Sequence, residues 1–198
     1  QLDHGVRVVS LSFPDSGVPL SWRAGSAESG VYLLDRPGGD AAAEVLSRLP
    51  LDDAGGSTIV SVHWGRNWGT DVPRGHRDFA RALLEDERIC LLFGHSSHHP
   101  KSVERVGSKV VMYGAGDLIN DYEGIGGHEA YRPELALLYI AELSRGGVER
   151  LEAVPFRRRR LRLERADRRD AERLFPLLAA DEESLVPELS EDGRFVFL

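Results

Sequence analysis

Two short apolar runs, each leading into a histidine near a glycine, constrain the fold of this 198-residue chain more than any other feature. Residues 57–62 lead into His63, and residues 89–93 lead through Gly94 into His95. Short apolar runs bounded by glycine are typical of buried strands. Parallel strands of α/β proteins present functional groups at their carboxyl ends. The sequence therefore predicts two neighbouring parallel strands that bring His63 and His95 together.

The apolar pattern predicts an α/β fold in which residues 1–198 form a single domain. Expected strands cover residues 6–13, 31–34, 57–62, 89–93, 103–106, 110–113, 135–143, 148–156, 161–165 and 194–198. Expected helices cover residues 40–49, with Asp40 as the cap, 74–85 and 167–178. Residues 51–56 are expected to form a turn. Alternation of strand and helix over residues 31–93 indicates a parallel sheet, and glycine turns later in the chain indicate two hairpins.

Charge and cysteine content exclude several classes of protein. The net charge of −7 argues against general nucleic-acid binding. Cys90 is the only cysteine, so the chain can form no internal disulfide, and apolar neighbours predict a buried core position. No apolar run reaches the roughly 18 residues that a membrane span needs, which indicates a soluble chain. The chain starts at Gln1 without Met, so we expect a missing upstream segment, and the compartment and oligomeric state stay open.

A histidine-rich loop follows the second of the two strands. His95 and His98 are three residues apart and can face one cavity, whereas Pro100 restricts His99, which can point away. Imidazole is the commonest protein metal ligand and also a base near neutral pH. The alternative is an exposed polar turn. A serine hydrolase is disfavoured, because the serines of this loop lie outside any Gly-x-Ser-x-Gly elbow.

Two further segments carry charged residues that could act at a site. Asp117 lies in a glycine-rich loop after an expected strand and could orient a histidine, although an ordinary glycine turn is an equal alternative. The loop lacks the phosphate-loop pattern, so nucleotide hydrolysis is disfavoured. The arginine run 157–160 is more typical of a solvated strand face than of an anion-binding patch.

Residues 60–65, 94–100 and 113–124 together resemble the CapA-type poly-γ-glutamate capsule biosynthesis proteins, a family similar to the calcineurin-like metallophosphoesterases. The resemblance implies a metallophosphatase-like α/β/β/α sandwich with two divalent metal ions. It implies that His63 and His95 bind one ion and that His98 binds the other. His98 and Asp117 would then be the catalytic residues, although many relatives have Asn at the position of Asp117.

The family's other ligands, in Asp-x-His, Gly-Asp and Asn-His motifs on N-terminal strands, are absent here. We therefore expect the C-terminal part of such a fold, without its N-terminal strands. The resemblance implies Mn, Zn or Fe as cofactor, an anionic polymer or phosphoester as substrate and a membrane synthase as a possible partner. It leaves two alternatives, a metal-dependent hydrolase of capsule or envelope polymer synthesis and a non-catalytic module that binds polymer or a partner.

Overall fold

The structure is a computed structural model that describes residues 5–50, 56–120, 125–144 and 146–198. The strands are β1 (Val6–Ser12), β2 (Ser57–His63), β3 (Ile89–His95), β4 (Val103–Val106), β5 (Lys109–Met112), β6 (Leu135–Ser144), β7 (Gly147–Arg159), β8 (Arg162–Arg165), β9 (Glu188–Leu189) and β10 (Phe195–Val196). The helices are α1 (Gly39–Arg48), α2 (Arg74–Leu84), α3 (Arg168–Glu172) and α4 (Phe175–Leu178). Short 3-10 helices cover Pro14–Ser16, Leu20–Trp22 and Glu129–Tyr131. The mixture of helices and strands confirms the predicted α/β class.

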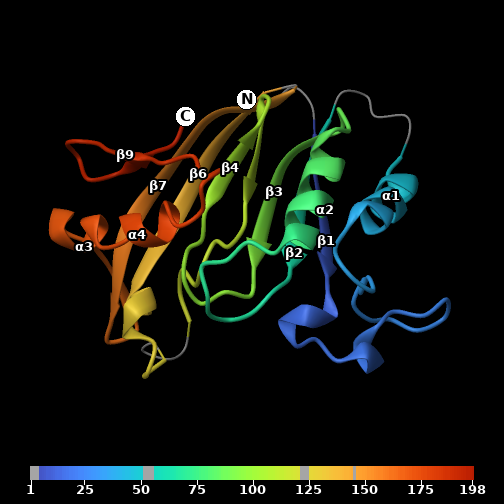
Figure 1. The fold of residues 1–198 in the computed structure, drawn as a ribbon, viewed down its shortest axis with the longest axis horizontal. Coiled ribbons are helices and arrows are strands. Elements are labelled where there is room, and N and C mark those ends of the chain that lie inside the picture. The colour runs from blue at the N-terminus through green and yellow to red at the C-terminus, as the bar shows by residue number, and fades with distance from the viewer. Residues whose placement is uncertain (1–4, 51–55, 121–124, 145) are drawn as a thin grey trace.

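The first sheet carries the two histidine strands side by side. Its order is β1-β2-β3-β5-β4, with β4 antiparallel to β5 and all other pairs parallel. In this register His63 pairs with His95, because both strands end at the same level. Figure 1 shows α1 and α2 beside this sheet, where their apolar faces form the first core with Phe13, Val60 and Leu92.

The second sheet is antiparallel and packs against the first through a second core. Its order is β6-β7-β10-β9, and β8 pairs with β7. The core joins Leu91 and Met112 of the first sheet to Leu137 and Leu151 of the second. Helices α3 and α4 lie beside β7 in Figure 1 and contribute Ala171 and Leu178 to the same core. Both predicted hairpins are present, as β4–β5 and β6–β7.

Three local predictions are wrong for identifiable reasons. Residues 31–34 form only isolated bridges, and β1 supplies the first strand of the sheet instead. The helix expected over residues 167–178 is divided into α3 and α4, because Pro176 lacks an N–H and would clash with the preceding turn. Asp40 is not the helix cap, because Gly38 occupies that position. Asp40 lies in the first turn of α1, where its carboxylate is near the positive end of the helix dipole.

One further predicted element is shorter in the structure, and another lies mostly outside the described residues. The final strand, expected over residues 194–198, is limited to Phe195–Val196. The turn expected over residues 51–56 lies outside the described residues apart from Gly56. Among the helices that the structure describes, none is both long and apolar enough to cross a lipid bilayer.

Cys90 should react slowly with thiol reagents in the folded protein. Its side chain is buried on β3, its Sγ donates to the Thr58 carbonyl at 3.4 Å, and burial raises the pKa of the thiol. The thiolate is the reactive form, so both access and ionisation oppose labelling. A chromogenic disulfide reagent should label the protein rapidly in denaturant and slowly in buffer. Equal rates in both conditions would contradict the buried position.

Candidate metal centre

His63 and His95 meet at the carboxyl ends of β2 and β3, as the sequence predicts. Their Nδ1 atoms lie 3.0 Å apart, and their ring centroids lie 5.1 Å apart. Both side chains are half-buried on the same face of the sheet. Two ring nitrogens that face each other at this distance can share a proton or bind one cation, so His63 and His95 form a candidate metal or proton-transfer site.

Burial favours the neutral form of both imidazoles. It lowers the pKa of His63, an effect that the carboxylate of Asp15 opposes and that positive charge on His98 reinforces. Burial also lowers the pKa of His95, and positive charge on His63 lowers it further. A histidine must be neutral to donate a lone pair to a metal, so these environments suit ligation at neutral pH.

Asp117 holds the third predicted ligand, His98. Asp117 Oδ2 lies 2.8 Å from Nδ1 of His98. Arg158 in turn donates to the Asp117 carbonyl at 3.2 Å and pairs with its carboxylate at 3.5 Å. The orienting contact that the sequence suggested for Asp117 is therefore present, whereas ligand and catalytic roles for His98 and Asp117 stay predictions. The prediction of a solvated arginine face is wrong for Arg158, which is buried because it reaches inward to this loop.

His99 and the loop serines have structural contacts. His99 is fully buried, its ring stacks on Tyr131 with centroids 4.6 Å apart, and burial lowers its pKa to about 4. Ser96 donates to the Gly65 carbonyl and Ser97 to the His99 carbonyl, at 3.0 and 2.9 Å. Ser96 has a φ of 120°, which non-glycine residues rarely adopt. These hydroxyls hold the loop in shape, and none is placed as a serine nucleophile.

Asp15 is a charged neighbour of the site that the sequence analysis did not identify. It lies just after β1, accepts from the Gly65 N–H at 3.0 Å and contacts Nε2 of His76 at 2.6 Å. It therefore connects the loop after β1 to the loop after β2 and to α2. A usable signal was present, because an acidic residue follows a strand whose carboxyl end lies at the same edge as His63.

The contribution of Asp15 to stability should disappear in acid. Burial alone would raise the pKa of its carboxyl, but the hydrogen bonds of His76 and the Gly65 N–H outweigh burial, and the pKa falls below its ordinary 3.8. A lowered folded-state pKa stabilises the protein above pH 3.8 and loses that effect as pH falls through the folded value. Asp15→Asn should cost about 0.5–1 kcal/mol at pH 7, a modest value because water screens the half-exposed group.

The measurement for Asp15 is urea unfolding of both proteins between pH 7 and pH 2.5. The difference in free energy of unfolding should shrink steadily below pH 3.8. Asp35→Asn, at a carboxylate that is 85% exposed, is the control and should change little at any pH. A constant difference for Asp15→Asn across the range would show that its charge does not stabilise the fold.

The donor atoms fit a divalent cation only in part. Among the described residues, no group of three or more His, Cys, Asp or Glu side chains converges on one point. The facing Nδ1 atoms of His63 and His95 form one pair, and His98 with Asp117 forms another. Two neutral imidazoles can begin the coordination of Zn, Mn or Fe, whereas the remaining positions need water, substrate or further protein groups.

One cavity lies against His95, and a second cavity shares Val31 and Tyr32 with it. The first, of about 300 Å³, is lined by His95 and by three serines, Ser10, Ser12 and Ser61. The second, of about 430 Å³, lies between residues 31–35 and α1. Their common wall places the second cavity beside the site.

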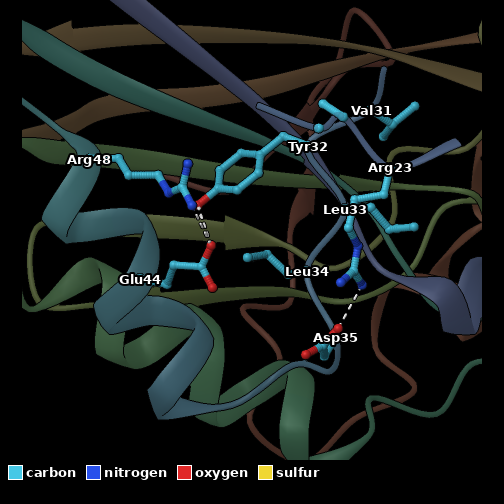
Figure 2. A pocket seen from close by; sticks show the side chains of 10 residues that line it. Arg23, Val31, Tyr32, Leu33, Leu34, Asp35, Glu44 and Arg48 are labelled. Atoms are coloured by element: carbon cyan, nitrogen blue, oxygen red, sulfur yellow. Dashed lines mark hydrogen bonds and ion pairs between the residues drawn. The ribbon is translucent and has the colours of Figure 1, made fainter. Parts of the chain in front are cut away.

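Figure 2 shows that the second cavity is lined by two pairs of opposite charge. The Arg48 guanidinium lies over the Tyr32 ring at 5.0 Å and pairs with Glu44 at 3.0 Å. Arg23 pairs with Asp35 at 2.6 Å on the other side. The cavity therefore presents guanidinium donors and carboxylate acceptors around an aromatic ring.

The α/β fold with histidines at adjacent strand ends is the arrangement expected of a metallophosphatase-like fold. The family model of the bacterial capsule synthesis protein PGA_cap, which belongs to that superfamily, matches residues 3–122. The chain therefore belongs to this family, and the resemblance to CapA-type proteins is confirmed.

Two curated relatives are similar to most of this chain. Both come from strains of Mycobacterium tuberculosis, are described as probable polyglutamine synthesis accessory proteins and are 42% identical over 175 residues. The aligned region covers 85% of this chain and 46% of each relative. The chain thus spans about half the length of the curated relatives it matches.

Proposed function

We propose that this chain is the histidine-bearing part of a metal-dependent hydrolase-type protein that acts in the synthesis of a capsule or cell-envelope polymer. The observation that carries the proposal is the 3.0 Å approach of the His63 and His95 Nδ1 atoms at adjacent strand ends. Membership of the capsule synthesis family and the accessory role named for the relatives support the polymer context. The substrate class is an anionic polymer or phosphoester, and a membrane synthase is a candidate partner.

The residues of this chain have distinct tasks in the proposed chemistry. His63 and His95 would hold a divalent cation, which when bound supplies Lewis-acid polarisation of a substrate oxygen. The Asp117 carboxylate accepts the Nδ1–H of His98, so it fixes the ring orientation and leaves the lone pair of the neutral ring on Nε2, the atom that would bind a cation or accept a proton. Arg158 holds Asp117 in place from the second sheet.

We expect this chain alone to bind at most one divalent ion with useful affinity. Three neutral histidines bring no negative charge to offset two divalent cations, and a two-metal site normally needs a carboxylate between them. The 198-residue chain should therefore bind Mn²⁺ or Zn²⁺ but hydrolyse a generic phosphodiester little or not at all. Calorimetric metal titration and a phosphodiesterase assay measure the two properties.

The matched variants are the double substitution His95→Ala with His98→Ala, and His128→Ala as control. The double variant should bind metal at least about 100-fold more weakly, since removing even an outer partner of a ligand commonly costs 10–100-fold. The control replaces a histidine that stacks on Trp68, with centroids 4.0 Å apart, and should bind normally. Absence of metal binding by the unmodified chain would refute the metal proposal. Robust turnover that the double variant abolishes would show that this chain builds a complete centre.

The second candidate function is non-catalytic binding of an acidic polymer, favoured by the cavity of Figure 2. A γ-linked glutamyl chain carries carboxylates that match Arg23 and Arg48, and amide N–H groups that match Asp35 and Glu44. Calorimetry with metal-free oligo-γ-glutamate should then detect binding. Arg23→Gln with Arg48→Gln should weaken it at least about tenfold, as expected when charge-assisted hydrogen bonds are lost.

The control for polymer binding is Arg105→Gln, because Arg105 donates to the Gly107 carbonyl in the β4–β5 turn, away from the cavity. The double substitution of His95 and His98 should leave oligomer binding intact if the cavity acts as a binding module. Oligomer binding that depends on those histidines and on added metal would instead favour the hydrolase.

A further inference from the structure

Ser61 contacts the nitrogen of His95 that faces away from His63. Ser61 lies on β2 two residues before His63, so both side chains point to the same face of the sheet. The Oγ of Ser61 lies 3.0 Å from Nε2 of His95, and Nδ1 of the same ring lies 3.0 Å from Nδ1 of His63. The two ring nitrogens of His95 thus have two different partners, a hydroxyl and an imidazole.

This arrangement links the Ser61 hydroxyl to the choice of His95 tautomer. A neutral imidazole carries one N–H and one lone pair, and a metal ion needs the lone pair. When Nε2 carries the hydrogen, it donates to the Ser61 Oγ, and the Nδ1 lone pair points toward His63. In the other tautomer the Nδ1–H would occupy the space between the rings. In the first tautomer of the metal-free protein, His63 donates its Nδ1–H to the His95 Nδ1 lone pair, and a cation can take this space once that hydrogen has moved to His63 Nε2.

The spacing of the two Nδ1 atoms is close to that of two ligands on one ion. Zn–N bonds of about 2.0–2.1 Å place two nitrogens of a tetrahedral site about 3.3 Å apart. The observed 3.0 Å differs from this value by an amount that small ring rotations can supply. Ser61 is 8% exposed, so little water competes for its hydrogen bond to His95.

We propose that Ser61 is a positioning residue whose hydroxyl accepts the Nε2–H of His95 and so directs the His95 Nδ1 lone pair toward a divalent cation shared with His63. The proposal deepens the metal centre proposed above and depends on it for its functional meaning. Its tautomer claim, however, concerns the metal-free protein and is measurable there. Outer partners of ligating histidines fix tautomer and ring orientation in this way.

The first experiment determines the His95 tautomer by ¹⁵N NMR of the metal-free 198-residue chain at pH 8, with His95→Gln used to assign the ring signals. The His95 ring should show a protonated Nε2 and an unprotonated Nδ1. In Ser61→Ala the signals should shift toward a mixture of tautomers. Ser61→Thr keeps the hydroxyl and should restore the original pattern. A protonated Nδ1 in the unmodified protein would overturn the proposal without reference to any variant.

The second experiment measures affinity for Mn²⁺ and Zn²⁺ by calorimetry. Ser61→Ala should bind about 10–100-fold more weakly, the usual cost of losing an outer partner of a ligand, and Ser61→Thr should stay within about threefold of the unmodified chain. Ser10→Ala replaces another serine that lines the same cavity and is the matched control. Equal losses for Ser10→Ala and Ser61→Ala would refute a specific role for Ser61.

The two experiments separate failure of this proposal from failure of the metal centre. If the unmodified chain binds no metal but His95 carries its hydrogen on Nε2, the hydrolase proposal fails and the Ser61 contact stands. If metal binds normally in Ser61→Ala and its His95 tautomer is unchanged, the metal centre stands and the Ser61 proposal fails.

Discussion

Replacing Gly94 with alanine should lower the free energy of unfolding by about 3 kcal/mol, at the upper end of the usual range for overpacking a core. A Cβ at this position would lie 2.2 Å from Nε1 of Trp64 and 2.6 Å from the Tyr113 carbonyl oxygen. These two groups form a 3.0 Å hydrogen bond with each other, so the methyl group would enter that bond. The substitution would also displace His95, the next residue of β3.

Urea unfolding followed by tryptophan fluorescence measures the effect of Gly94→Ala. Gly126→Ala is the control, because a Cβ at Gly126 meets no atom within 4 Å, and it should change the free energy of unfolding by less than about 0.5 kcal/mol. Metal affinity should fall together with stability in Gly94→Ala. A Gly94→Ala protein as stable as the control would mean that the Trp64 side chain moves aside at little cost.

Replacing Glu104 with alanine should destabilise the protein by a similar amount. Glu104 is 4% exposed, and its carboxylate accepts hydrogen bonds from three side chains: Arg77 at 2.7 Å, Arg81 at 2.7–2.8 Å and Tyr113 at 2.7 Å. Removing one partner from a buried ion pair typically costs about 3–5 kcal/mol because the other charge stays buried. We expect a cost at the lower end of this range, since Arg77 keeps its ion pair with Asp181.

Glu104→Gln separates the loss of charge from the loss of hydrogen bonds. It keeps an acceptor for Tyr113 and should be less destabilising than Glu104→Ala. Glu44→Ala, at an exposed carboxylate on α1, is the control and should cost less than about 1 kcal/mol. Equal unfolding midpoints for Glu104→Ala and Glu44→Ala would show that the buried ion pairs contribute no net stability.

Several elements could be predicted from the sequence because their signals are local. The runs before His63 and His95 are apolar and end at turns, which is sufficient to identify β2 and β3. Parallel pairing then brings the two histidines together, since the carboxyl ends of such strands share one edge. An orienting contact between Asp117 and a histidine was one of two equal alternatives, since a glycine-rich acidic loop follows another strand of this sheet, and the structure places Asp117 against His98.

Other features depended on contacts between residues far apart in the chain. Arg158 belongs to a run of four arginines that reads as a solvated strand, yet it turns inward because the Asp117 carboxylate and carbonyl lie within its reach. Asp15 becomes part of the site surroundings only when β1 pairs with β2. Arg158 has no local pattern that distinguishes it from an ordinary exposed charge. The position of Asp15 after a strand indicates its edge of the sheet but not its contacts.

Local patterns were sufficient to predict the α/β class, the hairpins and the pair of strand-end histidines, because periodicity and chain order are properties of short segments. Which ring nitrogen faces which partner follows instead from contacts in the folded protein. The Ser61 Oγ reaches His95 across 34 positions of sequence, and the two Nδ1 atoms approach across 32. Such contacts depend on strand register and side-chain rotamers, which are selected by packing of the whole sheet rather than by neighbouring residues.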